Sequence, residues 1–243
     1  GNFNYVLSDP DFYKALKNTC VFAFFSIFLQ LPLSLALALM LNSGKDRVKG
    51  VFRLMLFSPH LVGQVFVGIM FGIMFVPQFG LFNIFVDKVF GMGLQMNWLQ
   101  NPALVMPALV ITSLWMYVGF NMIYFLAALQ NVDKSLVEAA TIDGANAWQC
   151  FLHVTLPAIR PVTTFVVVMS TIGSFQLFEL PFVLLNNGFG PENAGITMVG
   201  YLYNAAFSAG DLGRGAAVGW LLTMIIFVLS LIQIRLSGTL KEN

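Results

Sequence analysis

Residues 138–161 read EAATIDGANAWQCFLHVTLPAIRP, and this stretch sets the organisation of the 243-residue chain. It is the longest polar-containing segment between two very apolar ones. Charged side chains are costly inside a bilayer. We therefore expect a membrane protein that holds an organised helical element outside the lipid.

The composition of the whole chain supports a membrane protein. The chain is 58% hydrophobic and 9% charged, and its mean hydropathy is +0.81. A soluble domain carries roughly a quarter charged residues, so these charges are too few to cover a surface that faces water. The net charge of +1 gives no reason to expect a nucleic-acid partner. Cys20 and Cys150 form neither a disulfide framework nor a metal-binding spacing, and residues 1–10 lack the pattern of a cleavable signal peptide.

Five apolar segments are long enough to cross a bilayer, which takes about 20 residues per helix. They are 17–41, 53–76, 103–127, 161–185 and 213–235. A helix satisfies all its backbone polar groups internally, as a bilayer requires. We therefore predict an all-α fold, a polytopic bundle of about five transmembrane helices that forms a single domain over residues 1–243.

Basic residues mark the two sides of the membrane. Eight flank one set of loops, namely Lys45, Arg47, Lys49, Arg53, Lys134, Arg160, Arg235 and Lys241. Four flank the other set, namely Lys14, Lys17, Lys88 and Arg214. The positive-inside rule then predicts a cytoplasmic location for the 128–160 loop and the C-terminus. Gly1 and the loops 77–102 and 186–212 are expected outside.

Within the 128–160 loop we predict two short helices. Residues 136–140 favour a helix, and Gly144 can end it, because glycine tolerates the left-handed conformation of a helix end. A second helix is expected over Ala145–Leu156, with Trp148 and Thr155 on one face and Pro157 breaking it. Two helices at an angle make a compact knob that can seat in a groove. The alternative is an amphipathic hairpin that lies on the membrane.

The order Glu-Ala-Ala, Asp-Gly-Ala, Leu-Pro in this loop resembles the EAA loop of permease subunits of ATP-binding-cassette importers, which is where the membrane subunit takes up force from a separate ATPase. The resemblance implies that the following residues form the ATPase-docking (coupling) helix and the end of its loop: Glu138, Ala139, Ala140, Asp143, Gly144, Ala145, Leu156 and Pro157. Residues 153–155, His-Val-Thr, depart from the apolar-rich stretch that is usual there.

The same resemblance implies partners. They are a second permease subunit, two ATPase subunits and an extracellular or periplasmic solute-binding protein, in the cytoplasmic membrane of a bacterium. Such permeases usually begin with one more span, ahead of a stretch similar to residues 2–12, so the resemblance also implies that this chain starts just after that helix. The chain looks most like the maltose and glycerol-phosphate permease group, which implies a sugar, oligosaccharide or related polyol as cargo.

Candidate residues of a substrate path lie in the third and fourth spans. Tyr117, Asn121 and Tyr124 step by four and three along one helical stripe, where aromatic faces and polar groups suit a sugar. Glu179 is the only acidic residue well inside a span, and Gln176, three residues earlier, is expected to share its face. Pro181, which follows, suggests a local break in this span, and the segment around Glu179 resembles a Phe-Asp segment of sugar-type permeases. Helix packing by polar residues, or an interfacial position of Glu179, is the alternative. Gln64 and Asn204 are weaker candidates.

Small residues and one cap complete the predictions. The pairs Gly68/Gly72 and Gly215/Gly219 have the spacing that permits close helix approach. Asp211 is expected to cap the last span.

The sequence contains no motif for nucleotide binding, hydrolysis or metal binding. Gly44-Lys45 lacks the upstream glycine and the Ser or Thr of a phosphate-binding loop, and no hydrolase or metal motif is present. We therefore expect no catalytic residue, no metal site and no cofactor in this chain, with ATP and Mg bound by the partner ATPase. The alternative function, an ion-coupled secondary transporter of small polar solutes, would call for more intramembrane charges and repeated halves.

Overall fold

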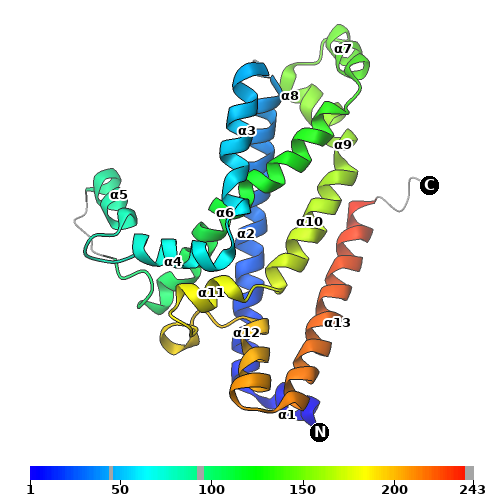
Figure 1. Cartoon of the computed structure of the whole chain (residues 1–243). Helices are drawn as coiled ribbons and strands as arrows, with labels where there is room; N and C mark the ends of the chain where they lie inside the picture. The colour runs from blue at the N-terminus through cyan, green and yellow to red at the C-terminus, as the bar shows by residue number, and fades with distance from the viewer. Residues whose placement is uncertain (44–45, 92–95, 239–243) are drawn as a thin grey trace.

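The computed structural model describes residues 1–43, 46–91 and 96–238, and every regular element in these ranges is helical (Figure 1). The all-α prediction is thus confirmed. The helices are α1 (Asn2–Ser8), α2 (Pro10–Ser43), α3 (Asp46–Leu61), α4 (Gln64–Met74), α5 (Leu81–Phe90), α6 (Pro102–Gln130), α7 (Lys134–Ile142), α8 (Ala147–Cys150), α9 (Leu156–Ala158), α10 (Arg160–Phe175), α11 (Glu179–Leu184), α12 (Met198–Tyr203) and α13 (Leu212–Ser237). Two π-helical turns, Phe151–Thr155 and Asn204–Ser208, and a 3-10 turn, Pro191–Asn193, complete the elements.

Three of the predicted spans are confirmed as single helices. In the described residues α2, α6 and α13 are each long and apolar enough to cross a membrane, and the number rises to five if each of two bent helix pairs counts as one span. Helices α2 and α6 make the most extensive contact of any pair in the bundle. They form its centre, against which the broken spans pack.

The predicted span over 53–76 is not one continuous helix. Helix α3 ends at Leu61, α4 begins at Gln64, and their axes meet at 96°. Pro59 lies in the last turn of α3 and has no N–H to offer the carbonyl of Met55, which instead accepts a hydrogen bond from the Ser58 hydroxyl at 3.1 Å. The backbone of Gly63 is extended, so the chain leaves the axis of α3 there.

The predicted span over 161–185 is also broken, and the break lies ahead of Pro181, where a local break was expected. Helix α10 ends at Phe175, and α11 begins only at Glu179. At its other end α10 is joined to the preceding helical segment, Ala147–Ala158, at a bend of 67°. Helix α10 therefore runs between two breaks, one at the knob and one near the middle of the molecule (Figure 1).

The surface and the interior have the polarity of a membrane protein. Large apolar side chains point outward on α2 and α13, and Phe28 is 65% and Phe227 62% exposed. Polar side chains are buried between helices, and the hydroxyl of Ser34 on α2 donates to the carbonyl of Val118 on α6 at 2.8 Å. Soluble monomers rarely expose large apolar side chains in continuous patches. The bundle is therefore built to be surrounded by lipid or by another membrane subunit.

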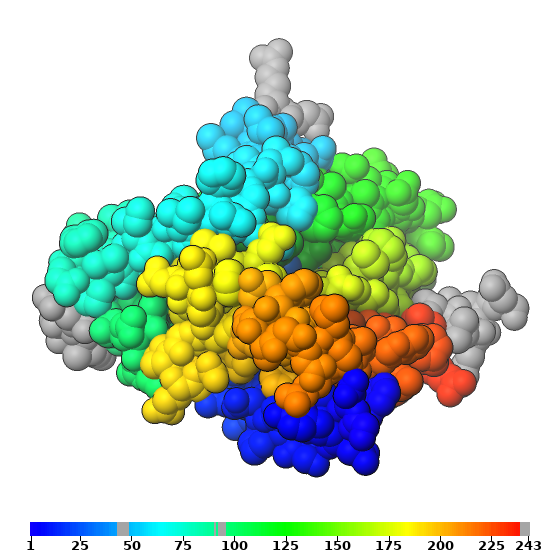
Figure 2. Space-filling model, turned by 60° about the horizontal axis from the view of Figure 1, so that its bottom comes forward, coloured from blue at the N-terminus to red at the C-terminus, as the bar shows by residue number. Residues whose placement is uncertain are grey.

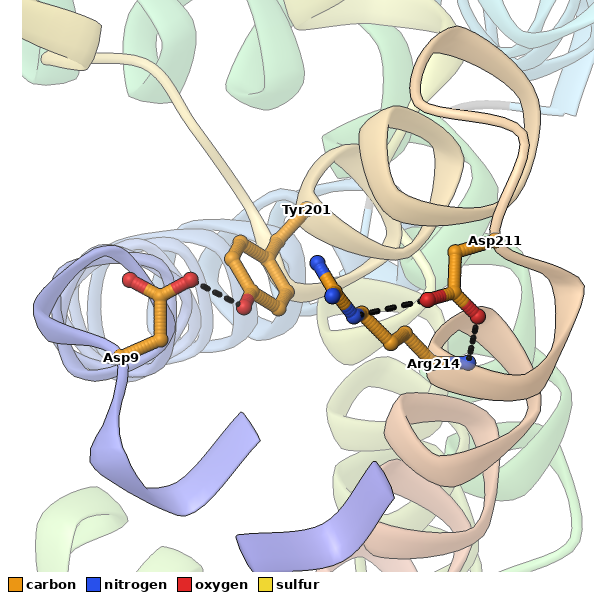
Figure 3. Close-up of polar contacts among 4 residues, drawn as sticks. All are labelled: Asp9, Tyr201, Asp211 and Arg214. Carbon is orange, nitrogen blue, oxygen red and sulfur yellow. Dashed lines mark hydrogen bonds and ion pairs between the residues drawn. The ribbon is translucent and has the colours of Figure 1, made fainter. Parts of the chain in front are cut away.

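Polar contacts tie the N-terminal residues to the far end of the chain (Figure 3). The Tyr201 hydroxyl donates to Asp9 at 2.6 Å, and burial together with this hydrogen bond raises the pKa of Tyr201. As predicted, Asp211 caps the last span by accepting from the backbone N–H of Arg214, with whose guanidinium it also pairs at 2.8 Å. That guanidinium stacks on the ring of Tyr5. Helix α1 is thereby fixed to the start of α13.

Close helix packing depends on one glycine that the spacing of small residues did not single out. A Cβ atom at Gly119 of α6 would lie 1.6 Å from the carbonyl oxygen of Leu56 on α3. Of the predicted pairs, Gly68 and Gly215 do sit against neighbours, whereas a Cβ at Gly72 would meet nothing within 4 Å. Gly119 is therefore the position where α3 and α6 touch backbone to backbone.

We predict that Gly119→Ala lowers the thermal stability of the purified protein in detergent. The added methyl group must push α3 away from α6, and overpacking of this kind costs about 1–3 kcal/mol or more. Gly72→Ala is the matched control and should leave the melting temperature unchanged or slightly raised, because alanine favours a helix. Equal melting temperatures for both variants would contradict the close contact.

Candidate functional site

A cavity of about 330 Å³ lies where the two broken spans meet α2 and α6. Its wall includes four predicted path residues, namely Tyr117, Asn121, Tyr124 and Gln176. Residues from α2, α6 and α10 form most of the rest, and Gln64 contributes the first turn of α4. Side chains that are far apart in the sequence thus converge on one space.

Glu179 is placed differently from the other candidates. It is exposed, in the first turn of α11, and does not line the cavity, although its carboxyl group lies close enough to Tyr117 to interact with it electrostatically. The expectation that Gln176 and Glu179 share a helix face is wrong, because the chain is not helical between Phe175 and Glu179. A role of Glu179 in a path stays a prediction.

Polar groups beyond the predicted ones line the same cavity. They are Gln30 from α2, Ser113 from α6, and Ser170 and Ser174 from α10. The amide of Gln64 donates to the hydroxyl of Tyr117 at 2.8 Å and so holds α4 against α6. Gln30 is 6% exposed, and an amide inside an otherwise apolar span was the signal that could have identified it.

Aromatic rings form one wall of the cavity. Phe120 and Tyr124 are in edge contact at 5.2 Å between ring centroids, and Tyr124 in turn meets Phe165 of α10 at 5.7 Å. Behind this wall the ring of His60 stacks on Phe120 at 4.0 Å and packs against Tyr117 at 5.4 Å. The cavity therefore combines aromatic faces with amide and hydroxyl groups.

The break between α10 and α11 is held open by buried hydroxyl groups. The hydroxyl of Thr197 donates to the carbonyl of Leu177 at 2.6 Å and also accepts from the N–H of Gly200. Next to it, the hydroxyl of Thr19 on α2 accepts from the N–H of Met198 at 2.9 Å. Both threonines are almost completely buried. The carbonyl of Leu177 at the break and the first N–H groups of α12 thus find partners inside the protein, as an apolar environment demands.

We predict that Thr197→Val destabilises the protein by about 1–3 kcal/mol, the cost of leaving buried polar groups without a partner. Valine has nearly the shape of threonine but cannot reach Leu177 or Gly200 with a hydrogen bond. Thr197→Ser keeps the hydroxyl and should lie close to the wild type. Thermal unfolding in detergent measures the difference, and a valine variant as stable as the serine variant would show that the hydroxyl is dispensable.

At one end of the bundle, α7 to α9 form the predicted knob (Figure 1). Asp133 caps α7 by accepting from the backbone N–H of Ser135 at 2.9 Å, and this hydrogen bond lowers the pKa of Asp133. Helix α7 ends at Ile142, and Gly144 follows with φ of +89°. The predicted helix over residues 136–140 and its glycine stop are confirmed.

The second helix of the knob differs from the prediction in its bounds. It begins at Ala147, because Asn146 and Gln149 form a capping box that fixes the start there. It continues through the π-helical turn to Ala158, so Pro157 does not break it. The bend follows two residues after Pro157, at Ile159, which is buried.

The predicted docking residues lie together on the knob. Glu138, Ala139, Asp143, Gly144 and Pro157 are exposed, and Ala140, Ala145 and Leu156 are partly buried. Four of these eight border an open hollow of about 340 Å³ between the two helices, namely Ala140, Asp143, Gly144 and Ala145. The knob therefore offers a surface and a hollow outside the membrane-spanning helices, while no residue of the set faces the cavity.

The two sites differ in what they can do chemically. The cavity can hold a polar molecule with an apolar face, and the knob can contact a protein. Among the described residues there is no group of three or more His, Cys, Asp and Glu that could hold a metal ion.

We predict that Gly144→Ala loosens the knob, because an L residue with a Cβ pays about 1 kcal/mol in the left-handed region. No neighbour lies within 4 Å of the added atom, so the effect comes from the backbone alone. Hydrogen exchange of the α7 amides should speed up in Gly144→Ala and less in Gly144→Asn, since asparagine tolerates this region better. Unchanged exchange in the alanine variant would contradict the turn.

Comparisons with known proteins place the chain among transport components. The family model of the binding-protein-dependent transport system inner membrane component matches residues 30–240. The arabinooligosaccharides transport system permease protein AraP of Bacillus subtilis (strain 168) is 42% identical over 243 residues, which are 99% of this chain and 77% of that protein. The lactose transport system permease protein LacF of Rhizobium radiobacter is 36% identical, over 96% of this chain and 78% of that protein.

A solved structure has the same fold. It is the crystal structure of a bacterial ABC transporter involved in the import of the acidic polysaccharide alginate. One of its chains superposes on this one with a TM-score of 0.85 at 23% sequence identity, over 97% of this chain and 82% of that chain. The prediction of an importer-permease fold is confirmed.

Proposed function

This chain belongs to the family of inner membrane components of binding-protein-dependent transport systems, and we propose on that basis that it forms the translocation path of an ATP-driven importer for oligosaccharides. The observation that carries the cargo class is its 42% identity, over nearly its whole length, to a permease named for arabinooligosaccharides. The family argues against the alternative of an ion-coupled secondary transporter.

The cavity supports a sugar as cargo. Sugars have hydroxyl groups around the ring edge and C–H bonds on the ring faces. Asn121, Gln176 and the serines of α10 supply hydrogen-bonding groups, and Tyr124 and Phe165 supply aromatic faces. A few polar groups in a largely apolar pocket is the usual composition of a small-molecule site.

ATPase subunits are proposed as the source of energy. The knob is the part of the described chain that projects from the ends of α6 and α10 (Figure 1), and its sequence resembles the docking loop of such permeases. The chain itself has no phosphate-binding loop. We infer that the ATPases bind ATP and Mg and contact the knob on the cytoplasmic side, the orientation that the distribution of basic residues favours.

A second permease subunit and a solute-binding protein complete the proposed assembly. Tyr124 is 37% and Phe165 48% exposed although both line the cavity. One chain therefore leaves the path open at the side, and a second permease would close it. The solute-binding protein would deliver cargo at the opposite end from the knob, where α1 and α12 lie (Figure 1).

Uptake by the reconstituted transporter tests this function. Proteoliposomes holding this chain with its second permease and ATPases should accumulate arabinose oligomers when ATP is inside and the solute-binding protein is outside. Accumulation driven by an ion gradient, with the chain alone and without ATP, would overturn the proposal in favour of a secondary transporter.

We predict that Glu138→Arg lowers co-purification of the ATPase by about tenfold or more, because reversing a charge at a protein interface costs several kcal/mol. Glu138 is exposed on α7, so the change should not disturb folding. Glu192→Arg makes the same charge reversal in the loop before α12 and should leave ATPase co-purification unchanged. Wild-type co-purification of the Glu138→Arg variant would show that the knob is not the docking element.

A further inference from the structure

Four aromatic rings from the segments around α11 and α12 are in contact with one another. We call Phe178, Phe182, Tyr203 and Phe207 the aromatic ladder. Tyr203 is its centre, with ring centroids 5.0 Å from Phe178, 5.4 Å from Phe182 and 5.5 Å from Phe207. Phe178 and Phe182 are themselves stacked at 5.2 Å. Every ring of the ladder is therefore in direct contact with the next.

The ladder is assembled from segments with unusual backbones. Phe178 precedes α11 at the break, Phe182 lies on α11, and Tyr203 ends α12. Phe207 lies in the π-helical turn Asn204–Ser208, and π-helical turns occur frequently at functional sites. These segments lie side by side on the face shown in Figure 2, coloured yellow and orange.

The exposure of the rings sets them apart from packed aromatics elsewhere. Phe178, Phe182 and Tyr203 are partly buried, and Phe207 is 67% exposed. In contrast, Phe71 and Phe75, which belong to another aromatic cluster, are at most 2% exposed. Phe178 and Phe182 also pack against the buried core that includes Met198 and Tyr201, so each of them keeps only part of its surface accessible.

The ladder begins one residue after the lining of the cavity ends. Gln176 and Leu177 line the cavity, and the next residue, Phe178, is the first ring of the ladder. Gln176 and Glu179 are both exposed and flank this ring in the sequence. Gln176 also lines the cavity, so the chain passes from a polar lining residue to the first ring of the ladder within two residues.

The charge distribution on aromatic rings suggests a sugar as the molecule that binds to the ladder. The face of an aromatic ring carries partial negative charge, and the C–H bonds on the face of a sugar ring carry partial positive charge, so the two faces attract each other. Because the four rings touch, a sugar unit that leaves one ring already contacts the next. The free-energy barrier between neighbouring positions is then small, and a chain of several sugar units can contact several rings at once.

We propose that the aromatic ladder is a sliding track for oligosaccharide chains between the outer end of the bundle and the cavity. The proposal rests on the proposed function, since it assigns further binding positions to the same path. It also makes the ladder a determinant of chain-length selectivity, because longer oligosaccharides cover more rings than short ones.

Uptake of sugars of different length by the complete transporter in proteoliposomes tests the ladder. The probes are arabinose and its linear oligomers. Phe178→Leu and Tyr203→Leu remove a ring but keep an apolar side chain, and uptake of the longer oligomers should fall by about five-fold for each ring removed, with a smaller loss for the shortest. Phe178→Tyr and Tyr203→Phe keep the ring and should restore uptake.

Phe28→Leu is the matched control, because Phe28 on α2 is an exposed ring that stacks on Phe24 and does not belong to the ladder. It should leave uptake of every oligomer unchanged. Equal loss for all chain lengths in the leucine variants would assign the rings to packing against lipid or a second subunit and overturn the track. Unchanged uptake by both leucine variants would also overturn it, with the proposed function intact. Absence of any saccharide uptake by the wild-type complex would instead overturn the proposed function, and the track with it.

Discussion

Backbone polar groups inside a membrane protein must find partners within the protein, and the site described here depends on how this constraint is met at one place. The chain leaves the helix between Phe175 and Glu179, and the freed carbonyl of Leu177 accepts a hydrogen bond from the buried hydroxyl of Thr197. Thr19 of α2 satisfies the neighbouring N–H of Met198. Irregular backbone at membrane depth is tolerated only where it is buried or lines a cavity, and here it does both.

The position of α10 connects the two functional regions. This helix starts at the bend of Ile159, directly after the knob, and ends at Phe175, at the edge of the cavity. It packs on α2 and α13 along the way. A helix transmits displacement along its axis with little loss because its hydrogen bonds resist extension. A shift of the knob along this axis would therefore reach Gln176 and the first ring of the aromatic ladder.

The sequence predicted the helical class, the three unbroken spans and the position of the knob, because apolar length, capping residues and glycine act locally. It gave no break in the span over 53–76, because both halves of this span are apolar and hydropathy alone does not register a change of direction. Pro59 and Gly63 marked the first break in retrospect, whereas Pro181 marked the second only loosely, since the break precedes it. Gly119 and the contacts of Thr197 depend on residues far away in the sequence, and no local pattern could reveal them. Gln176, which the sequence predicted as a path residue, does line the cavity, although it does not share a helix face with Glu179 as predicted.

The most direct measurement is the side from which the thiol of a Gln176→Cys variant can be labelled. Cys20 and Cys150 are first replaced by serine, and the assembled transporter is treated with a membrane-impermeant thiol reagent from either side, with and without ATP. If the cavity is a translocation path whose access is switched by ATPases bound to the knob, the introduced thiol reacts from the cytoplasmic side in one nucleotide state and from the outer side in the other. Labelling from the same side in both states, in a transporter that still accumulates sugar, would contradict this mechanism.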